Sequence, residues 1–305
     1  MGRRPAGHAR EGGVVHAHHG GHRRGADGRH PERRHRRPAQ VTPDALAAWR
    51  IAAEPYYRPL GDECERFEAA WSQRLPLLLK GPTGCGKTRF VEHMAWRLGK
   101  PLVTVACNDD TTAGDLVGRW LLDAGGTRWQ DGPLTLAARH GAICYLDEIV
   151  EARADTAVVI HPLTDTRRML PLERNGELVH AHADFALVVS YNPGGTRSLK
   201  ASTRQRFCGM EFAYPGTEEE TEIVMREAGV GVETAAALVA LGIRSRRLAG
   251  HGLEEGASTR MLVRTAQLVR AGMSPVAASR MALVAPLTDD VVLRDALLAA
   301  VDASF

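Results

Sequence analysis

A strand-like apolar run that leads directly into a glycine-rich loop constrains this chain more than any other feature. Residues 75–79 have the length and apolar composition of a central parallel strand. The loop that follows has the spacing Gly-x-x-x-x-Gly-Lys-Thr, in which backbone N–H groups turn inward and a helix begins at the last residues. This pattern predicts a cradle for nucleotide phosphates. Its residues are Gly81, Pro82, Thr83, Gly84, Cys85, Gly86, Lys87 and Thr88.

The two residues that close the loop have different expected roles. Lys87 is predicted to reach the β- and γ-phosphates, and Thr88 is predicted to offer its hydroxyl to Mg²⁺. Apolar residues with helical spacing follow from Phe90 to Leu98. Because the strand, the loop spacing and the helix all agree, a chance glycine-rich turn is a poor explanation of the pattern.

A pair of acids ends a second buried strand, which is expected over residues 142–147. Ligands of α/β sheets bind at the carboxyl ends of the strands, where Asp147 and Glu148 are placed. Such a pair is ambiguous alone. Together with the phosphate loop it predicts that Asp147 holds Mg²⁺ and that Glu148 polarises the water that attacks the γ-phosphate. A small-molecule kinase would not usually need Glu148, so the pair favours hydrolysis.

Asn192 stands at the tip of another buried strand, which is expected over residues 185–190. Its side chain is a candidate for orienting the attacking water or for sensing the γ-phosphate. The same residue, in Tyr-Asn-Pro-Gly, is also an ordinary turn former. The phosphate loop and the acid pair favour the catalytic interpretation.

Alternating strands and helices predict an α/β fold, a parallel P-loop sheet with helices on both faces. Further strands are expected at 101–106 and 209–213, and two inserted β-hairpins at 119–130 and 168–180. Beyond residue 216 the strands stop, and helical patterns predict a small all-α lid. We therefore expect a disordered tail at 1–40, a core ATPase domain at 41–216 and a helical lid at 217–305.

The helical patterns make more detailed predictions. Helical stretches are expected on both sides of an extended segment at 54–59, and one helix at 151–163. In the lid, Ser258-Thr259 and Asp289 are expected N-caps. The lid helices are expected at 218–227, 233–248, 259–271, 275–283 and 289–301.

Charge is distributed unevenly along the chain. Residues 1–37 hold ten arginines against three acids, a net of +7, so a total of +3 leaves −4 on the remainder. The mildly acidic body argues against a nucleic-acid-binding face. The first 40 residues also hold seven of the thirteen histidines among Gly, Pro and Arg, a composition typical of a disordered tail, to which we assign no function.

The cysteines and the hydropathy pattern bear on location. The five cysteines are scattered, without a C-x-x-C pair, and are expected to be reduced and mostly buried. No apolar run approaches the roughly 18 residues of a membrane span, and the start lacks the apolar centre of a signal peptide. The expected location is the cytoplasm.

Five further motifs are more specific than the phosphate loop and the acid pair. They are Trp129-Gln-Asp-Gly-Pro-Leu134, Ile160-His-Pro-Leu-Thr-Asp165, Ser190-Tyr-Asn-Pro-Gly194, Ser202-Thr-Arg-Gln-Arg-Phe207 and Glu255-Gly-Ala-Ser-Thr-Arg260. With them, the chain from about residue 55 to its end resembles an AAA+ ATPase of the MoxR group, within the CbbQ/NirQ/NorQ family. The resemblance implies hydrolysis of ATP with Mg²⁺.

The resemblance also implies roles for single residues. Asn192 matches the sensor 1 position, and Arg260 matches sensor 2 on the lid. Arg206 matches the arginine finger, with Arg204 as a second candidate. The assignment of the finger to one of these two arginines stays undecided, because the connection at 194–199 is shorter than is usual in the family.

Members of this family are similar in forming hexameric rings that remodel a target protein. The resemblance therefore implies a homo-oligomer, a partner with a von Willebrand factor A domain and a client enzyme. The clients known in the family are rubisco, freed of inhibitory sugar phosphates, and nitric oxide reductase. The sequence does not choose between these clients.

Two other classes of protein share parts of this pattern. A DNA-dependent AAA+ motor also carries hairpins of these kinds, but the acidic body speaks against it. A nickel-metallochaperone GTPase would combine a His-rich tail with a phosphate loop, yet the guanine-reading motif Asn-Lys-x-Asp does not occur in the sequence.

Overall fold

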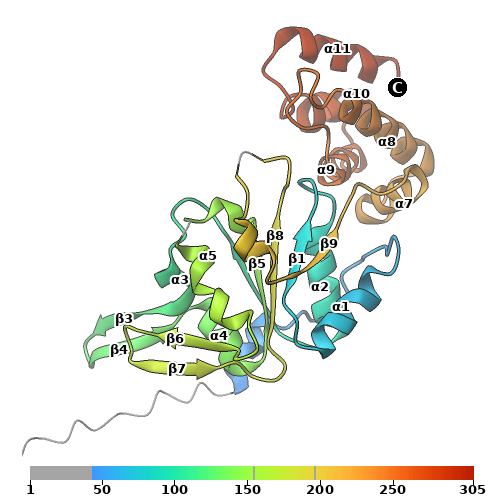
Figure 1. Cartoon of the computed structure of the whole chain (residues 1–305). Helices are drawn as coiled ribbons and strands as arrows, with labels where there is room; N and C mark the ends of the chain where they lie inside the picture. Colours follow the sequence, from blue (N-terminus) through green and yellow to red (C-terminus); the bar gives the residue numbers. More distant parts are fainter. Residues whose placement is uncertain (1–42, 154, 196) are drawn as a thin grey trace, which may run out of the picture. The chain divides into compact units, whose positions relative to one another are not determined.

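The computed structural model describes residues 43–153, 155–195 and 197–305 (Figure 1). The expected tail at 1–40 lies outside the described residues. A five-stranded sheet forms the centre of the described chain, in the order β2-β5-β8-β1-β9, and every neighbouring pair is parallel. Its strands are β1 (Leu77–Lys80), β2 (Leu102–Ala106), β5 (Ile143–Asp147), β8 (Ala186–Tyr191) and β9 (Cys208–Glu211).

Side chains of the central strands alternate between two apolar clusters, one on each face of the sheet. In β1, Leu78 enters one cluster, whereas Leu77 and Leu79 enter the other. In β8, Val189 enters the same cluster as Leu78, and Val188 enters the same cluster as Leu77 and Leu79. This is the period-2 pattern of a strand that is buried on both faces, which explains why the strands are almost wholly apolar.

Helices cover both faces of the sheet, as predicted (Figure 1). One face packs against α1 (Glu63–Ser72) and α2 (Lys87–Arg97), which contribute Phe67 and Phe90. The other face packs against α3 (Ala113–Val117) and α4 (Pro133–His140), which contribute Leu116 and Leu134. The predicted fold class is therefore confirmed.

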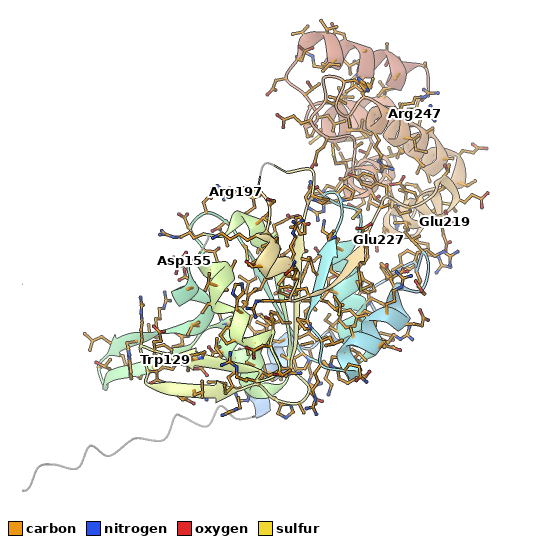
Figure 2. All side chains as sticks on the ribbon, viewed as in Figure 1. Trp129, Asp155, Arg197, Glu219, Glu227 and Arg247 are labelled. Carbon is orange, nitrogen blue, oxygen red and sulfur yellow. The ribbon has the colours of Figure 1, made fainter. Side chains whose placement is uncertain are left out.

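Both predicted hairpins are present. The first consists of β3 (Gly118–Asp123) and β4 (Gly126–Asp131), and the second of β6 (Met169–Leu172) and β7 (Glu177–His180). Trp129 of the first hairpin is labelled in Figure 2 and packs edge-on against Trp120, which faces it across the pair. The Trp120 indole N–H donates to the carbonyl of Arg174 at 2.9 Å, so the two hairpins are bonded to each other.

The C-terminal region is helical and has an apolar cluster of its own, which includes Leu238, Leu262 and Val301. Ser258 caps the helix that follows it, as predicted, because its hydroxyl accepts the Met261 N–H. The elements are α7 (Thr217–Ala228), α8 (Val232–Arg247), α9 (Thr259–Arg270), α10 (Pro275–Ser279), the π-helical turn η4 (Arg280–Val284) and α11 (Val291–Asp302).

The structure corrects several local predictions. Residues 151–163 do not form one helix; the region holds η2 (Ile149–Glu151), α5 (Thr156–Val159) and η3 (His161–Leu163). Pro162 lies in the first turn of η3, because its ring and missing N–H disfavour the interior of a longer helix. The cap of α11 is Asp290, which accepts the Leu293 N–H at 2.9 Å, and not Asp289.

The N-terminal part of the described chain also differs from prediction. The first helical stretch is a 3₁₀ helix, η1 (Pro43–Trp49), and not an α-helix. The first strand begins at Leu77 and not at Leu75, which is 44% exposed and follows Arg74 at a positive φ of 58°. The turn at Arg74 ends the preceding helical segment and delays the strand.

Candidate nucleotide-binding site

The phosphate loop connects β1 to α2 at the carboxyl end of the central strand. Gly81 has no room for a side chain, since an added Cβ would lie 2.5 Å from the carbonyl oxygen of Phe212. Gly86 precedes α2 at a φ of +106°, a conformation that side chains other than hydrogen rarely allow. The glycines are thus required by close approach and by backbone conformation, and they bring the loop's N–H groups to the start of a helix.

Lys87 begins α2 at the end of this loop and is only 5% exposed. Its ammonium donates to the carbonyls of Gly81 at 2.7 Å and Pro82 at 3.0 Å. Both acceptors are neutral, and an anionic phosphate oxygen is a stronger acceptor for a cation than a carbonyl is. The buried ammonium therefore fits a site for phosphate.

The two predicted magnesium ligands meet at one point. The hydroxyl of Thr88 donates to Oδ2 of Asp147 at 3.1 Å. The other carboxylate oxygen, Oδ1, accepts from the Tyr145 hydroxyl at 2.7 Å and from the Ser190 hydroxyl at 2.6 Å. A hydroxyl and a carboxylate oxygen are the hard ligands that Mg²⁺ prefers, so the donor set fits this ion.

Glu148 follows directly in a left-handed backbone conformation, with φ 53° and ψ 49°. Its backbone N–H donates to the Ser190 hydroxyl at 3.1 Å, so the same serine holds both acids of the pair. Burial raises the pKa of the Glu148 carboxyl, and the charge of Lys87 opposes this rise. A raised pKa strengthens a carboxylate as a proton acceptor, and strained backbone of this kind is concentrated at functional sites.

Asn192 follows β8 and lies beside the phosphate loop. Its amide nitrogen donates to the Thr83 hydroxyl at 3.3 Å and to a carboxylate oxygen of Glu255. Its amide oxygen accepts the backbone N–H of Gly194 at 3.0 Å. The structure thus brings the predicted sensor residue to the loop, and it adds Glu255, which lies in one of the sequence motifs but had no predicted role.

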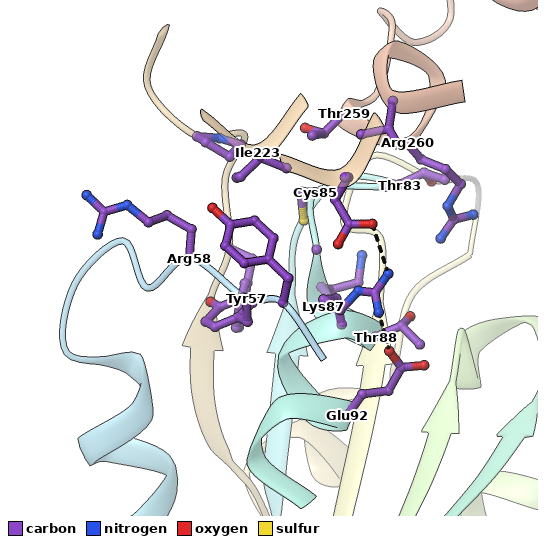
Figure 3. Close-up of a pocket in the computed structure, with 18 of the residues that line it drawn as sticks. Tyr57, Arg58, Thr83, Cys85, Lys87, Thr88, Glu92, Ile223, Thr259 and Arg260 are labelled. Atoms are coloured by element: carbon purple, nitrogen blue, oxygen red, sulfur yellow. Dashed lines mark hydrogen bonds and ion pairs between the residues drawn. The ribbon is translucent and has the colours of Figure 1, made fainter. Parts of the chain in front are cut away.

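A cavity of about 520 Å³ opens above the loop (Figure 3). Lys87, Thr88, Asp147 and Glu148 all line it, together with Arg260 of α9. Its size falls within the range of small-molecule sites. Sequence patterns did not identify the rest of the wall. Arg89 and Glu92 of α2 belong to it, and four further segments contribute Tyr56, Tyr57, Arg58, Leu60, Phe212, Pro215, Ile223, Glu227, Val263, Arg264 and Gln267.

The two candidate finger arginines lie elsewhere. Arg204 ends α6 (Ala201–Arg204), and Arg206 follows in the turn before β9; both are exposed. Neither is among the described residues that line the cavity. Arg206 is instead near His161, whose pKa is lowered by burial and further by the Arg206 charge. The structure therefore joins Arg260 to the cavity but not Arg204 or Arg206.

A chain of polar contacts connects the phosphate loop to the C-terminal helices. The Tyr214 hydroxyl donates to the carbonyl of Thr83 at 3.0 Å. The guanidinium carbon of Arg246 lies 3.8 Å from the centre of the Tyr214 ring, on which it stacks. Arg246 makes a double hydrogen bond to Glu220, at 2.7 and 2.6 Å, and Glu220 is fully buried. Burial raises the pKa of Tyr214 to about 12, so the hydroxyl keeps its proton. No local motif marks these residues.

Two family models match successive parts of the chain. Residues 76–207 match the model of an AAA domain of the dynein-related subfamily, and residues 220–304 match that of the CbbQ/NirQ/NorQ C-terminal region. The chain is 63% identical over 258 residues to protein CbbQ of Hydrogenophilus thermoluteolus, covering 84% of this chain and 97% of that protein. This chain belongs to the CbbQ/NirQ/NorQ family. The predicted resemblance is thereby confirmed.

Other members of the CbbQ/NirQ/NorQ family are nearly as similar. The denitrification regulatory protein NirQ of Stutzerimonas stutzeri is 57% identical, covering 82% of this chain and 88% of that protein. Protein NorQ of Paracoccus denitrificans is 56% identical, covering 80% of this chain and 91% of that protein. A RuvB variant from Thermotoga maritima shares the fold at 18% identity, with a TM-score of 0.50 over 79% of this chain and 68% of that chain.

Membership of the family implies an AAA+ ATPase with an activase-type role, which binds nucleotide. In the part of the chain that the structure describes, no helix is both long and apolar enough to cross a membrane. The five cysteines are free, and only Cys208 is exposed, in agreement with the prediction of mostly buried thiols.

Proposed function

We propose that this family member hydrolyses ATP with Mg²⁺ in order to remodel a client enzyme. The observation that carries this proposal is that Lys87, the Thr88–Asp147 pair and Glu148 line one cavity, with Asn192 beside its phosphate loop. These groups come from three segments, the start of α2, the end of β5 and the turn after β8, and each group suits a different task in the transfer of a phosphoryl group to water.

Each group has one proposed task. Lys87 binds the β- and γ-phosphates in place of its two carbonyl acceptors. Thr88 and Asp147 hold Mg²⁺, which when bound neutralises phosphate charge. Glu148 accepts a proton from the attacking water, and Asn192 orients this water or contacts the γ-phosphate.

A further cation is needed on the far side of the γ-phosphate, where charge develops during the reaction. We propose that Arg206, with Arg204 as the second candidate, supplies it to the cavity of a neighbouring copy. Support comes from their exposure and from their absence among the described residues of their own cavity wall. A head-to-tail arrangement of this kind closes into a ring, and we propose a hexamer.

We further propose that residues 41–216 form the ATPase core and that residues 217–305 form a lid. The lid would move with the nucleotide through Arg260 and through Arg246, whose guanidinium lies over the ring of Tyr214, the residue that donates to the carbonyl of Thr83. We also propose that the protein is cytoplasmic and works with a partner that carries a von Willebrand factor A domain. Its sequence similarity to the family supports both proposals.

The client is proposed to be rubisco or nitric oxide reductase. The purified chain, alone and with the candidate partner, should release phosphate from ATP, and it should restore the activity of one of these enzymes from its inhibited or immature form. No phosphate release under either condition would refute the ATPase proposal. Phosphate release without any effect on either enzyme would refute only the choice of client.

A further inference from the structure

The side-chain amide of Asn192 has both of its N–H groups engaged. They donate to the Thr83 hydroxyl, at 3.3 Å, and to a carboxylate oxygen of Glu255. The orientation of the amide is fixed by Gly194, because a backbone N–H can only donate and therefore faces the amide oxygen. An amide nitrogen has two N–H groups, so in this structure Asn192 has no donor left for a phosphate oxygen.

Glu255 reaches Asn192 from a tightly held segment between α8 and α9. The next residue, Gly256, lies so close to α8 that an added Cβ would clash with the backbone of Arg246. Ala257 then donates its N–H to the Ser245 hydroxyl at 2.9 Å and accepts from Arg246 at 2.8 Å. The Glu255 side chain is therefore presented from a fixed part of the helical region, directly before the helix that carries Arg260.

We propose that Glu255 is a positioning residue that competes with the γ-phosphate of ATP for the amide of Asn192. The proposal rests on the proposed role of Asn192 as the residue that contacts the γ-phosphate. Glu255 and the γ-phosphate are both anionic acceptors, and one N–H cannot serve both of them. Two anions that approach the same donor also repel each other.

ADP lacks the third phosphate and leaves the contact between Asn192 and Glu255 intact. ATP must take over one of the two donors that Thr83 and Glu255 engage, and repulsion between Glu255 and the γ-phosphate makes Glu255 the acceptor that leaves. Glu255 thus makes the release of Asn192 from the helical region depend on the γ-phosphate, and it weakens the binding of ATP selectively.

The test compares the affinities of ADP and of AMP-PNP, a non-hydrolysable analogue of ATP, by titration calorimetry. Loss of a charge-assisted hydrogen bond is expected to let Glu255→Ala bind AMP-PNP about 3- to 30-fold more tightly than the wild type, with ADP affinity within about twofold. Glu254→Ala is the matched control, because Glu254 is the neighbouring exposed carboxylate. It should change neither affinity by more than about twofold.

An equal gain for ADP and AMP-PNP would show a general charge effect and would overturn the proposal. So would unchanged affinities for both nucleotides.

A second variant separates this inference from the role of Asn192. Asn192→Ala should alter the ratio of the AMP-PNP and ADP affinities, and in that background Glu255→Ala should have no further effect. If the ratio is unaltered in Asn192→Ala, Asn192 does not contact the γ-phosphate. The proposed competition between Glu255 and the γ-phosphate is then refuted as well. An altered ratio in Asn192→Ala but not in Glu255→Ala would refute the competition alone. Absence of nucleotide binding in the wild type would instead refute the proposed function.

Discussion

The Thr88 hydroxyl and a carboxylate oxygen of Asp147 lie 3.1 Å apart, although the residues are separated by 59 positions in the sequence. Thr88 follows β1 and Asp147 ends β5, and these strands are not neighbours, because β8 lies between them. Ser190 of β8, the strand between them, holds the end of β5 by donating to Asp147 at 2.6 Å while it accepts the Glu148 N–H. The order of the strands therefore brings the proposed magnesium ligands and the proposed base to one edge of the sheet.

Replacement of Glu148 by glutamine should separate binding from hydrolysis. Glu148→Gln is expected to keep ATP binding but to slow hydrolysis by about 10²- to 10⁴-fold, since the carboxylate serves the water and not the phosphates. Lys87→Ala should instead abolish binding at ordinary ATP concentrations. Phosphate release and nucleotide affinity measured for both variants check this assignment. It is wrong if Glu148→Gln loses affinity as badly as Lys87→Ala does.

Removal of residues 1–40 should leave the ATPase rate within about twofold of the wild type. The described residues that line the cavity begin at Tyr56, and the described hydrogen bonds of the phosphate loop come from within the loop or from residues after it. The rate of phosphate release from the truncated chain, at matched protein concentration, provides the check. A loss of tenfold or more would show that the tail takes part in assembly or chemistry.

Local patterns were sufficient to predict the sheet and the phosphate loop. The apolar run at Leu77–Lys80 and the spacing of Gly81, Gly86 and Lys87 are local, and each residue in them has a physical requirement that the structure displays. The carboxyl ends of parallel strands converge at one edge of the sheet, so the sequence alone also places Asp147 and Asn192 near the loop.

Contacts between distant segments could not be predicted in this way. Glu255 is 63 positions from Asn192, and the cavity wall combines Tyr57, Phe212 and Val263, which belong to no shared motif. Such contacts depend on tertiary packing, which propensity does not encode. The error at residues 151–163 is of another kind, because Pro162 is a local signal against one long helix, and the structure has η2, α5 and η3 there.

Truncation of the buried acid Glu220 should destabilise the protein strongly. Glu220→Ala leaves the Arg246 guanidinium without the double hydrogen bond that it makes to this carboxylate. Breaking a buried pair by removing one partner typically costs about 3–5 kcal/mol in the free energy of unfolding. Urea unfolding of the variant checks this value. The exposed Glu218, in the first turn of the same helix, is the control, and Glu218→Ala should cost less than about 1 kcal/mol.

The neutral state of His161 should make stability fall at acid pH. Its Nε2 is 3.1 Å from the Thr203 hydroxyl, and burial together with the Arg206 charge lowers its pKa from 6.5. The unfolded chain therefore binds a proton at His161 more readily than the folded chain does. This contribution to stability is present above pH 6.5 and is lost as the pH falls towards the lowered pKa.

The corresponding measurement is the free energy of unfolding between pH 7.5 and pH 5.5 for the wild type and for His161→Gln. Glutamine keeps hydrogen-bonding capacity but cannot take up the proton, so the variant should lose stability less steeply on acidification. His140, whose pKa burial also lowers, is common to both proteins and cancels in the difference. Parallel pH profiles would show that His161 does not titrate as described.

The last prediction concerns Arg206, the proposed source of the cation on the far side of the γ-phosphate. Lys87 and Arg260 line the cavity, whereas Arg206 is exposed and is not among the described residues of its wall. An arginine finger is typically worth about 10³- to 10⁵-fold in rate, so Arg206→Ala should be nearly inactive and yet bind ATP. The measurements are the rate of phosphate release and the affinity for ATP, with Arg204→Ala as the parallel variant.

Mixing two inactive variants tests whether Arg206 acts on the neighbouring copy. Lys87→Ala and Arg206→Ala should each be inactive alone, because every interface of the ring lacks one of the two cations. In mixed rings some interfaces join an intact Lys87 to an intact Arg206, and part of the activity should return. If the mixture stays inactive although mixed oligomers form, Arg206 acts within its own copy or not at all. Recovery with Arg204→Ala in place of Arg206→Ala would instead identify Arg204 as the finger.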